Sequence, residues 1–458
     1  MRVAIVGGGI SGACVASKLS ALAPNATITL FDQGRRGPGG RASHRAVSEN
    51  VVVADDPPIP KSALEFDHGC QFFRADTLEM RALATSWCAA GWTAEWRGRF
   101  GTAGQGTVDD FFGLPSLDAP VYIGIGGMHM LPRQLLQACD PNRVIVRRGV
   151  RVAGMDREAD GAWALLGVSG SAAFHDTADA AAQQAQREVL GLFDLVVLTD
   201  VSSSFGGWHR ASAGVPDAFA ARVRDRVRVP MFSAMVAFES TLDLPLDGIS
   251  FPSAGGLWFA ARTQSKPGLD GSGGGAECWT LISTPKFATD EIKDEPMQDA
   301  TTGAFKPQDD GYLNNGPAPA LLRAFLTQTA PLRPAAAAGT PTPAVVYLQG
   351  QRWGSALPAP SGVGGRDAKG RGAQTVELMG VEYESSTPPL VFARPDPTAD
   401  DLATMIFAED ANDYLADDAL GLYYAGDFTS RRAPGFEAAA LAGLAAAEHI
   451  ARRIGGAA

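Results

Sequence analysis

Long apolar runs, paired cysteines and an excess of positive charge are all missing from this 458-residue sequence. No run of about eighteen apolar residues occurs, so no membrane-spanning helix is expected. The five cysteines are scattered and form no CxxC pair, which favours free thiols in a reducing compartment and indicates no metal site. The formal net charge is −11, which argues against nucleic acid or an anionic membrane as the main partner.

A targeting segment is also missing from the beginning of the sequence. No basic region followed by a long apolar stretch precedes the first expected strand, so we expect a cytoplasmic protein. Apolar residues make up 45% of the chain and charged residues 19%, so the chain can bury a large core. Its length suits two or three domains.

The clearest pattern lies in the first forty residues. A short apolar run ends in the glycines Gly7, Gly9 and Gly12, a helical pattern follows, and a β-rich run from Thr27 ends at Asp32. This order of strand, tight turn, helix, strand and acidic residue is typical of the unit that binds a dinucleotide. The sequence therefore predicts a dinucleotide site here.

Each residue of this unit has an expected task. Gly7 makes the turn, Gly9 lets the backbone approach the diphosphate, and Gly12 lets helix and strand pack closely. The helix begins at Ile10 and Ser11, whose free N–H groups would meet the phosphates, and Ser11 is expected to cap the helix. The Asp32 carboxylate would accept ribose hydroxyls and disfavours NADP, which carries a 2′-phosphate there.

The segment after Asp32 bears on which dinucleotide is bound. It runs Gln33-Gly34-Arg35-Arg36-Gly37-Pro38-Gly39-Gly40-Arg41. A second Gly-Gly-Arg beside the diphosphate suits a longer, more buried cofactor with further backbone and cationic contacts. We therefore expect Gln33, Arg35, Gly40 and Arg41 to contribute to an FAD site; an exposed basic turn is the alternative.

The C-terminal region repeats the pattern of strand, glycine and helix. An apolar run ending at Ala425 leads into Gly426-Asp427, and a helical pattern begins at Phe436. Asp427 would accept a ribityl hydroxyl. The helix N-terminus would face the pyrimidine edge of the flavin, where reduction leaves negative charge.

These motifs together resemble the FAD-binding signature of the flavin amine oxidase superfamily, and within it the renalase-like branch. Further matches follow in order along the chain. They are Asp67-x-Gly69-x-Gln71, Gly126-Gly127-Met128-x-x-Leu131-Pro132, Lys266-Pro267-Gly268, Arg352-Trp353 before Ala356-Leu357-Pro358, and Phe436-Glu437-Ala438-Ala439 with Gly443. The sequence departs from the family pattern in one additional arginine between Asp32 and Gly39, in Ala438 where glycine is expected, and in Ala440 where an aromatic residue is frequent.

The resemblance implies further site residues. Val152 matches the residue whose backbone contacts the adenine; an ordinary strand valine is the alternative reading. The candidates for the substrate pocket are His68, Gln71, Phe72, Trp258, Arg352 and Trp353. Core packing is the alternative reading for the aromatic residues, and a structural role for the histidine. No catalytic residue is identified.

The predicted fold is α/β, a Rossmann-like FAD-binding domain with an interleaved mixed-sheet α+β substrate domain. We expect the FAD-binding domain to comprise residues 1–80, 121–205 and 405–458, and the substrate domain 81–120 and 206–404. Within the former, 144–146, 150–155 and 163–168 predict a strand meander, and 193–199 predicts a parallel strand buried on both faces. The segments 169–189, 268–275 and 357–400 are expected to be inserted loops, with 268–275 flexible.

The expected function is that of an FAD-dependent oxidoreductase. By resemblance, hydride passes from a small donor to flavin N5, and O2 reoxidises the flavin and gives H2O2; in the renalase-like branch the donor is a dihydronicotinamide dinucleotide isomer. FAD is expected to be noncovalent, because no cysteine occurs in the C-terminal part of the chain. An amine or amino-acid oxidase or a desaturase of the same superfamily, and a non-catalytic FAD-binding protein, are the alternatives.

Overall fold

The structure is a computed structural model that describes most of the chain. The residues outside the description are 48–63, 104–119, 170–186, 205–207, 210, 217–218, 220–222, 224–225, 227, 252–255, 293–309, 335–339, 359–373, 379–380, 386–412 and 457–458. Most of the two expected insertions 169–189 and 357–400 therefore lies outside the described residues. Within the described part, no helix is both long and apolar enough to cross a bilayer.

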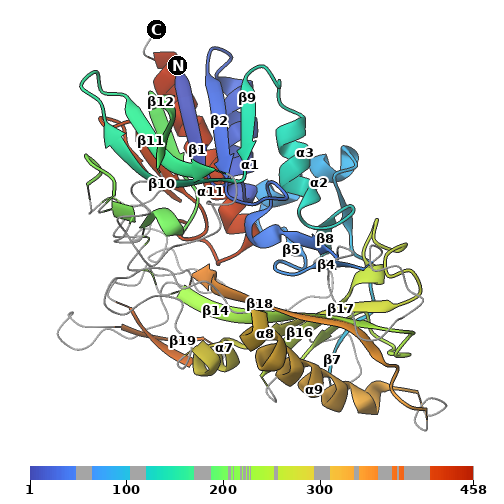
Figure 1. Ribbon diagram of the computed structural model, residues 1–458. Coiled ribbons are helices and arrows are strands. Elements are labelled where there is room, and N and C mark those ends of the chain that lie inside the picture. The colour runs from blue at the N-terminus through green and yellow to red at the C-terminus, as the bar shows by residue number, and fades with distance from the viewer. Residues whose placement is uncertain are drawn as a thin grey trace, which may run out of the picture.

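A six-stranded sheet contains strands from the N-terminal and the C-terminal parts of the chain (Figure 1). Its strands, in spatial order, are β21 (Tyr414–Asp417), β22 (Leu422–Ala425), β13 (Leu195–Leu198), β1 (Arg2–Val6), β2 (Thr27–Asp32) and β9 (Val144–Arg148). All neighbours pair in parallel except β21 with β22. Because β1 pairs with β2 on one side and β13 on the other, the crevice at the carboxyl ends of β1 and β13 is the switch point where such sheets bind ligands.

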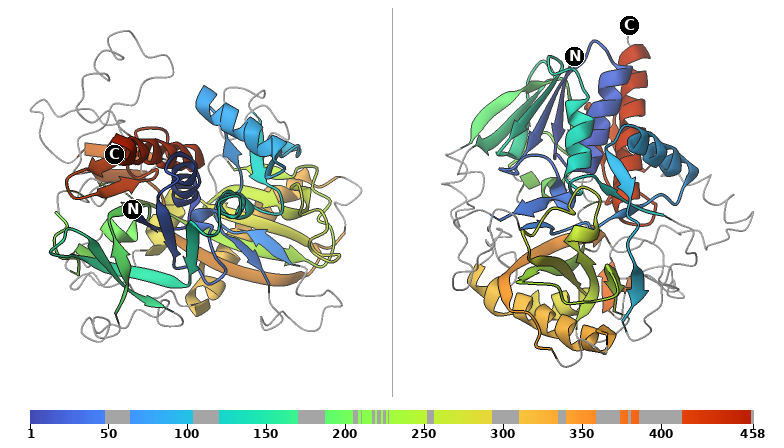
Figure 2. Two further views of the ribbon diagram at one scale, coloured as in Figure 1. Left: turned by 90° about the horizontal axis from the view of Figure 1, so that it is seen from above. Right: turned by 90° about the vertical axis from the view of Figure 1, so that its right-hand side faces the viewer.

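The two faces of this sheet are covered differently. Helices α1 (Ile10–Leu22), α3 (Met130–Gln137) and α11 (Phe436–Gly456) lie on one face, and the sheet of β10 (Val150–Arg157), β11 (Trp163–Ser169) and β12 (Glu188–Phe193) lies on the other (Figure 2, right). Alternation along β1 serves both faces, since Val3 and Ile5 pack with the helices while Ala4 and Val6 pack with the meander. Burial on both faces explains the apolar sequence of β1 and of β13, the latter as predicted.

The predicted meander was wrong in one strand. Residues 144–146 belong to β9, which pairs in parallel with β2 at the edge of the large sheet. The third strand of the meander is β12, which pairs with β11 and includes residues 188 and 189 of the expected insertion. The alternation of short apolar stretches fits either sheet, so the sequence pattern could not distinguish the two pairings.

A second mixed sheet lies beneath the first layer (Figure 1). Its order is β18 (Val345–Pro358), β14 (Arg228–Phe238), β17 (Glu277–Ser283), β16 (Leu257–Arg262), β15 (Gly248–Ser250) and β7 (Phe100–Thr102). One face packs on α7 (Pro285–Ile292), α8 (Asp310–Asn315) and α9 (Pro317–Thr329) through a core that includes Phe232 and Phe325. The other face turns toward the first layer.

Short strands lie between the two layers (Figure 1). They are β3 (His44–Ala46) with β4 (Glu65–Asp67), and the sheet of β5 (Phe73–Arg74), β8 (Val121–Gly124) and β6 (Thr93–Glu95). Helix α2 (Leu78–Ala89) contacts β6. A separate hairpin is formed by β19 (Gln374–Leu378) and β20 (Val381–Ser385). The sheet β5-β8-β6 joins residues on both sides of position 120, so the domain boundaries remain a proposal.

The segment 268–275, expected to be a flexible insertion, makes a close contact with the loop after β8 at its first residue. Leu269 is 2% exposed, and Gly126 donates its N–H to the Pro267 carbonyl at 3.2 Å. Gly268 has φ +77°, and a Cβ there would lie 2.6 Å from the Gly126 nitrogen. Glycine at position 268 thus serves a close backbone contact, which composition alone could not separate from flexibility.

We predict that Gly443→Ala destabilises the protein, because a Cβ at Gly443 on α11 would lie 2.4 Å from the Ser11 carbonyl oxygen on α1. The free energy of unfolding in urea should fall by about 1–3 kcal/mol. Gly455→Ala on the same helix is the control, since nothing lies within 4 Å of the added Cβ. That change should be neutral or stabilising by up to ~1 kcal/mol. Equal effects of the two variants would contradict the close helix contact.

Candidate cofactor site and the adjoining pocket

The glycine turn after β1 forms a cradle at the start of α1. Gly7 has φ +109°, and a Cβ at Gly12 would lie 2.0 Å from the Gly7 carbonyl oxygen, so both positions require glycine. By contrast, nothing lies within 4 Å of a Cβ built at Gly9. The first turn of α1 begins at Ile10, where backbone N–H groups have no intrahelical partner. An anionic group can therefore approach the backbone at Gly9.

The predicted Ser11 cap was wrong. The N-cap residue of α1 is Gly9, and no side chain caps the helix. The Ser11 hydroxyl donates instead to the Ala425 carbonyl at the end of β22, at 3.1 Å. A serine in the first turn can bond either way, and the sequence does not show that β22 ends beside it.

Asp32 closes the cradle on the β2 side. Its carboxylate is buried and accepts the N–H groups of Gly8 (2.9 Å) and Gly34 (2.8 Å). Burial raises the pKa of Asp32 in spite of these two bonds. The neighbouring Gln33 and Arg35 are exposed, and Val152 is a buried residue of β10.

Arg41 and Asp427 join the two ends of the chain. The Arg41 guanidinium contacts both Asp427 oxygens, at 2.7 and 2.5 Å, and also donates to the Ala356 carbonyl of β18 at 2.9 Å. Burial alone would lower the pKa of Arg41, but the charge of Asp427 and its hydrogen bonds together raise that pKa. The adjacent Gly40 has φ +54° and lies against Gly9. The second Gly-Gly-Arg therefore adjoins the first glycine turn.

Asp200 is a functional candidate that the sequence analysis missed. It follows β13 at the switch point, and its Cβ lies 3.4 Å from a Cβ built at Gly7. Oδ2 accepts bonds from Ser202 and Ser203, but Oδ1 is buried and has no hydrogen-bond partner among the described residues. Burial raises the pKa of Asp200. An acidic residue directly after a buried strand, as at Asp32 and Asp427, was the available signal.

These features fit a dinucleotide cofactor such as FAD. The open cradle at Gly9 suits a diphosphate. The buried carboxyl groups beside it, one with an unpaired oxygen, suit sugar hydroxyls. The predicted residue Phe436 begins α11 and stacks on Phe73, with ring centroids 4.6 Å apart. Gly426 and Asp427 lie at the same sheet edge, directly after β22.

The loop 67–71, which follows β4, is fixed by the second sheet. The Asp67 carbonyl accepts the Thr280 hydroxyl of β17 at 2.9 Å, and the His68 carbonyl accepts the Ser233 hydroxyl of β14 at 2.6 Å and the Trp353 indole of β18 at 2.9 Å. Three strands of the second sheet therefore hold one loop of the first layer.

The six predicted pocket residues have different surroundings. His68 and Trp353 stack at 5.4 Å, and the Gln71 amide is bonded to the Asp67 and Gly69 carbonyls and to Lys266. Phe72 and Trp258 pack against the same core, while Arg352 is a buried residue of β18. Gln71 therefore has a structural role, which the sequence interpretation did not anticipate.

The His68 side chain has a ring nitrogen that is not used in any hydrogen bond within this group. It is 8% exposed, and its Nδ1 has no hydrogen-bond partner among the described residues. Burial, reinforced by the charge of Arg45, lowers the pKa of His68 to about 3. The imidazole is therefore neutral at pH 7 and can accept or donate a hydrogen bond.

Asp67 is the hub of a buried ionic network. Its carboxylate accepts Lys266 Nζ at 3.0 Å, His44 Nδ1 at 3.1 Å and the Met128 N–H at 2.9 Å. Although burial opposes ionisation, the Lys266 charge holds the pKa of Asp67 well below its usual range. The sequence interpretation found Asp67 through its motif and did not connect it with Lys266.

His129 lies beside this network, and His44, Asp67 and His129 could together offer three ligand atoms to a metal ion. The Asp67 oxygens are already bonded to Met128 and to the Lys266 ammonium, so a cation would have to displace bonds and meet a like charge. We derive no metal chemistry from the cluster.

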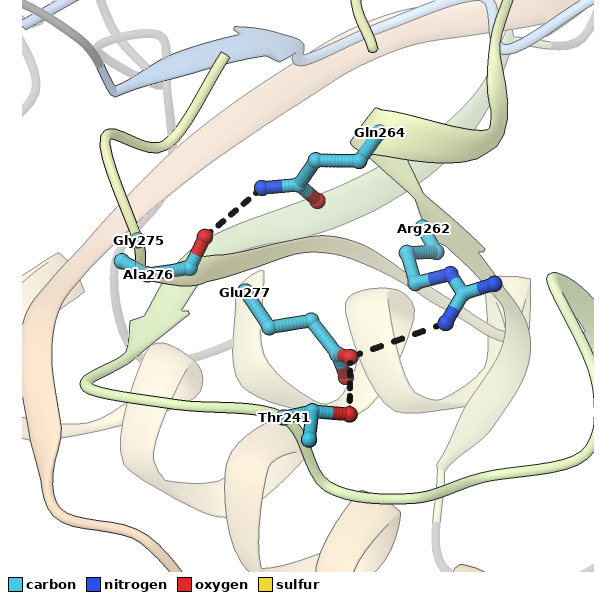
Figure 3. Close-up of a pocket in the computed structure, with 6 residues that line it drawn as sticks. All are labelled: Thr241, Arg262, Gln264, Gly275, Ala276 and Glu277. Atoms are coloured by element: carbon cyan, nitrogen blue, oxygen red, sulfur yellow. Dashed lines mark hydrogen bonds and ion pairs between the residues drawn. The ribbon is translucent and has the colours of Figure 1, made fainter. Parts of the chain in front are cut away.

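A separate small pocket lies in the second domain (Figure 3). Glu277 in this pocket accepts the Thr241 hydroxyl at 2.9 Å and lies 3.6 Å from the Arg262 guanidinium, while Gln264 donates to the Ala276 carbonyl. None of the predicted site residues lines it. It is not the candidate site.

We predict that Lys266→Met destabilises the protein strongly, because the side chains of Lys266 and Asp67 are at most 1% exposed and a buried carboxylate without its ammonium partner would remain. The free energy of unfolding should fall by about 3–5 kcal/mol. Adding Asp67→Asn to Lys266→Met should restore part of the lost free energy of unfolding. The coupling energy in the double-mutant cycle should be at least ~1 kcal/mol. Lys286→Met, at an exposed pair, is the control and should change stability by less than ~0.5 kcal/mol.

The acid dependence of stability gives a second readout of the same pair. Because the pKa of folded Asp67 is depressed, its stabilisation is complete above the ordinary carboxyl pKa of about 4 and is lost as the pH falls below it. The free energy of unfolding of the wild type should therefore decrease as the pH is lowered below about 4. A stability curve of Lys266→Met with the same slope as wild type in that range would contradict the assignment.

Comparison with known proteins supports the fold. Residues 5–86 match the family NAD(P)-binding Rossmann-like domain. A search of curated proteins found no match. Among solved structures, the chain is similar to a candidate protoporphyrinogen oxidase from Exiguobacterium sp. 255-15 (TM-score 0.53, 12% identity, 99% of each chain covered).

Two further structures extend the comparison. They are reduced UDP-galactopyranose mutase (TM-score 0.52, 11% identity, 99% of this chain and 97% of that chain) and cyclohexylamine oxidase from Brevibacterium oxydans IH-35A (TM-score 0.50, 12% identity, 99% of each chain). At such low identity the likeness concerns the fold alone. The chain therefore has a Rossmann-like domain combined with mixed α/β sheets, the fold of FAD-dependent oxidoreductases.

Proposed function

We propose that the chain is an FAD-dependent oxidoreductase that accepts hydride from a small organic donor. The observation that carries this proposal is the Arg41–Asp427 contact, which places the C-terminal Gly-Asp beside the glycine cradle of β1 and α1. The strand, turn and helix of the N-terminal unit are sufficient to bind a dinucleotide, so the C-terminal Gly-Asp is a further element that suits a longer cofactor. The fold comparison is consistent with the proposal.

The proposed cofactor residues surround the switch point. The N–H groups of Ile10, Ser11 and Gly12 would meet the diphosphate, and Asp32 would bind the adenosine ribose from the β2 side. Asp427 and the unpaired oxygen of Asp200 would accept hydroxyl groups on the β22 and β13 side. Gly40 and Arg41 would close over the diphosphate, and the backbone of Val152 would meet the adenine. No described cysteine is proposed as an attachment point, and FAD is proposed to be noncovalent.

FAD, when bound, supplies the redox chemistry by accepting a hydride. The chain would contribute orientation and electrostatics. The N-terminus of α11 at Phe436 offers a partial positive charge for the negative charge of the reduced state. The loop 67–71 and the stack of His68 on Trp353 would form a wall of the donor pocket. With its low pKa, His68 would offer a neutral imidazole to the donor.

The finer proposal concerns the donor and the acceptor. Resemblance to the renalase-like branch favours a dihydronicotinamide dinucleotide isomer as donor, with O2 as acceptor. Such a donor transfers hydride without a general base, which agrees with a pocket whose one identified titratable wall residue is a neutral His68. An amine donor is the second candidate, since a low-pKa imidazole could accept a hydrogen bond from an amine N–H.

The decisive measurement is an anaerobic flavin-reduction screen with the purified yellow protein. We expect dihydronicotinamide dinucleotide isomers to bleach the flavin absorbance rapidly, and readmitted oxygen to restore it with formation of H2O2. Bleaching by amines with none by the isomers would assign the amine oxidase function. Reduction by neither class would favour a non-catalytic flavoprotein. Acid precipitation should release free FAD, whereas flavin retained in the pellet would show covalent attachment.

A further inference from the structure

The loop between β22 and α11 has an unusual support. Residues 426–430 of this loop carry Asp427, and α11 begins at Phe436. The loop is partly held by local bonds, with the Thr429 and Ser430 N–H groups donating to the Gly426 carbonyl. Asp413 adds bonds from the Ser430 hydroxyl (3.0 Å) and the Arg431 N–H (3.1 Å). These contacts come from within the C-terminal segment.

The remaining support comes from the centre of the sequence. Arg226, which is 9% exposed, directs Nη1 at three carbonyl oxygens of this loop. The distances are 3.0 Å to Asp427, 3.1 Å to Phe428 and 2.8 Å to Ser430. Three carbonyl dipoles converging on one cation shape the backbone more strictly than a single hydrogen bond does, because each carbonyl must point at the same atom.

The position of Arg226 in the chain gives this contact a wider consequence. Arg226 lies two residues before β14, the strand that pairs with both β18 and β17 in the second sheet. Arg41 makes a parallel connection, since it binds the Asp427 carboxylate and the Ala356 carbonyl of β18. Arg226 therefore binds the backbone of Asp427, and Arg41 binds its side chain. Arg226 precedes β14, and Arg41 contacts the neighbouring strand β18.

We propose that Arg226 is a positioning residue for the cofactor. It holds the Asp427 backbone in place and thereby couples cofactor binding to the position of β14. The inference rests on the proposed function, because Asp427 is a proposed FAD ligand. Coupling of this kind is reciprocal. An ordered loop raises the affinity for FAD, and bound FAD in turn stabilises the connection between the loop and the second sheet.

A simply stabilising arginine is the rival explanation, and the chain offers a matched control. Arg157 Nη1 donates to the Leu420 carbonyl at 2.6 Å, and its guanidinium lies 4.6 Å from the centre of the Trp163 ring. Arg157 thus anchors a carbonyl just before β22, at the strand end opposite to Asp427. Both arginines tie down a chain segment next to the same strand, but one lies at the proposed cofactor edge.

The test compares Arg226→Met with Arg157→Met in the full-length protein. FAD dissociation constants are measured by titrating the apoprotein and following flavin fluorescence. Loss of the three bonds should raise the constant at least ~10-fold in Arg226→Met. Arg157→Met should leave it within about twofold even if both variants melt earlier. Visible circular dichroism of the bound flavin should change in Arg226→Met alone, because the ring environment shifts with the start of α11.

Arg226→Lys covers the case in which Arg226→Met does not fold. Lysine keeps the charge but lacks the planar fork, so its FAD affinity and flavin spectrum should fall between wild type and Arg226→Met. Wild-type affinity in a folded Arg226 variant, or equal losses in both methionine variants, would overturn the inference. If wild type itself binds no FAD, the proposed function fails. Binding by wild type with unchanged binding by the Arg226 variants refutes the positioning role alone.

Discussion

The contact between Arg41 and Asp427 is the constraint on which the arrangement depends. These residues are 386 positions apart, and their pairing brings the loop after the first strand unit against the loop before the last helix. The N-terminal cradle is open at Gly9, and the pair brings the C-terminal Gly-Asp close to it. The pair also has a structural cost, because Asp427 is almost fully buried and requires a cation nearby. Charge compensation and assembly of the site are therefore the same event.

A second buried carboxylate, Asp67, links the layers in the same manner. Lys266 contacts it from the turn between β16 and β17 of the second sheet, and His44 contacts it from the neighbouring strand β3. The carbonyls of the following loop are bound by side chains from β14, β17 and β18. Hinge motion between the layers would break these bonds together.

The sequence predicted what local chemistry determines and missed what pairing over long distances determines. The glycine turn, Asp32 and the buried strand β13 follow from spacing, because a strand, turn and helix within thirty residues fold next to one another. The strand at 144–148 was assigned to the wrong sheet, since its pattern fits both. The roles of Gln71 and Asp200 could not be predicted from the sequence. The role of Gln71 depends on its contact with Lys266, and that of Asp200 depends on its place at the end of β13, and no motif connects these residues in sequence.

The reaction is a separate question from the fold. Structures of similar fold include a cyclohexylamine oxidase and a UDP-galactopyranose mutase, so one fold accompanies different chemistry. In this chain the polar atoms of Gln71 are occupied by Lys266 and by backbone carbonyls, whereas His68, which stacks on Trp353, keeps Nδ1 without a hydrogen-bond partner among the described residues. A buried imidazole with a pKa of about 3 cannot offer a positive charge at neutral pH. Recognition of an anionic donor group must therefore come from arginine or backbone groups, and His68 can contribute a neutral hydrogen bond and a stacking face.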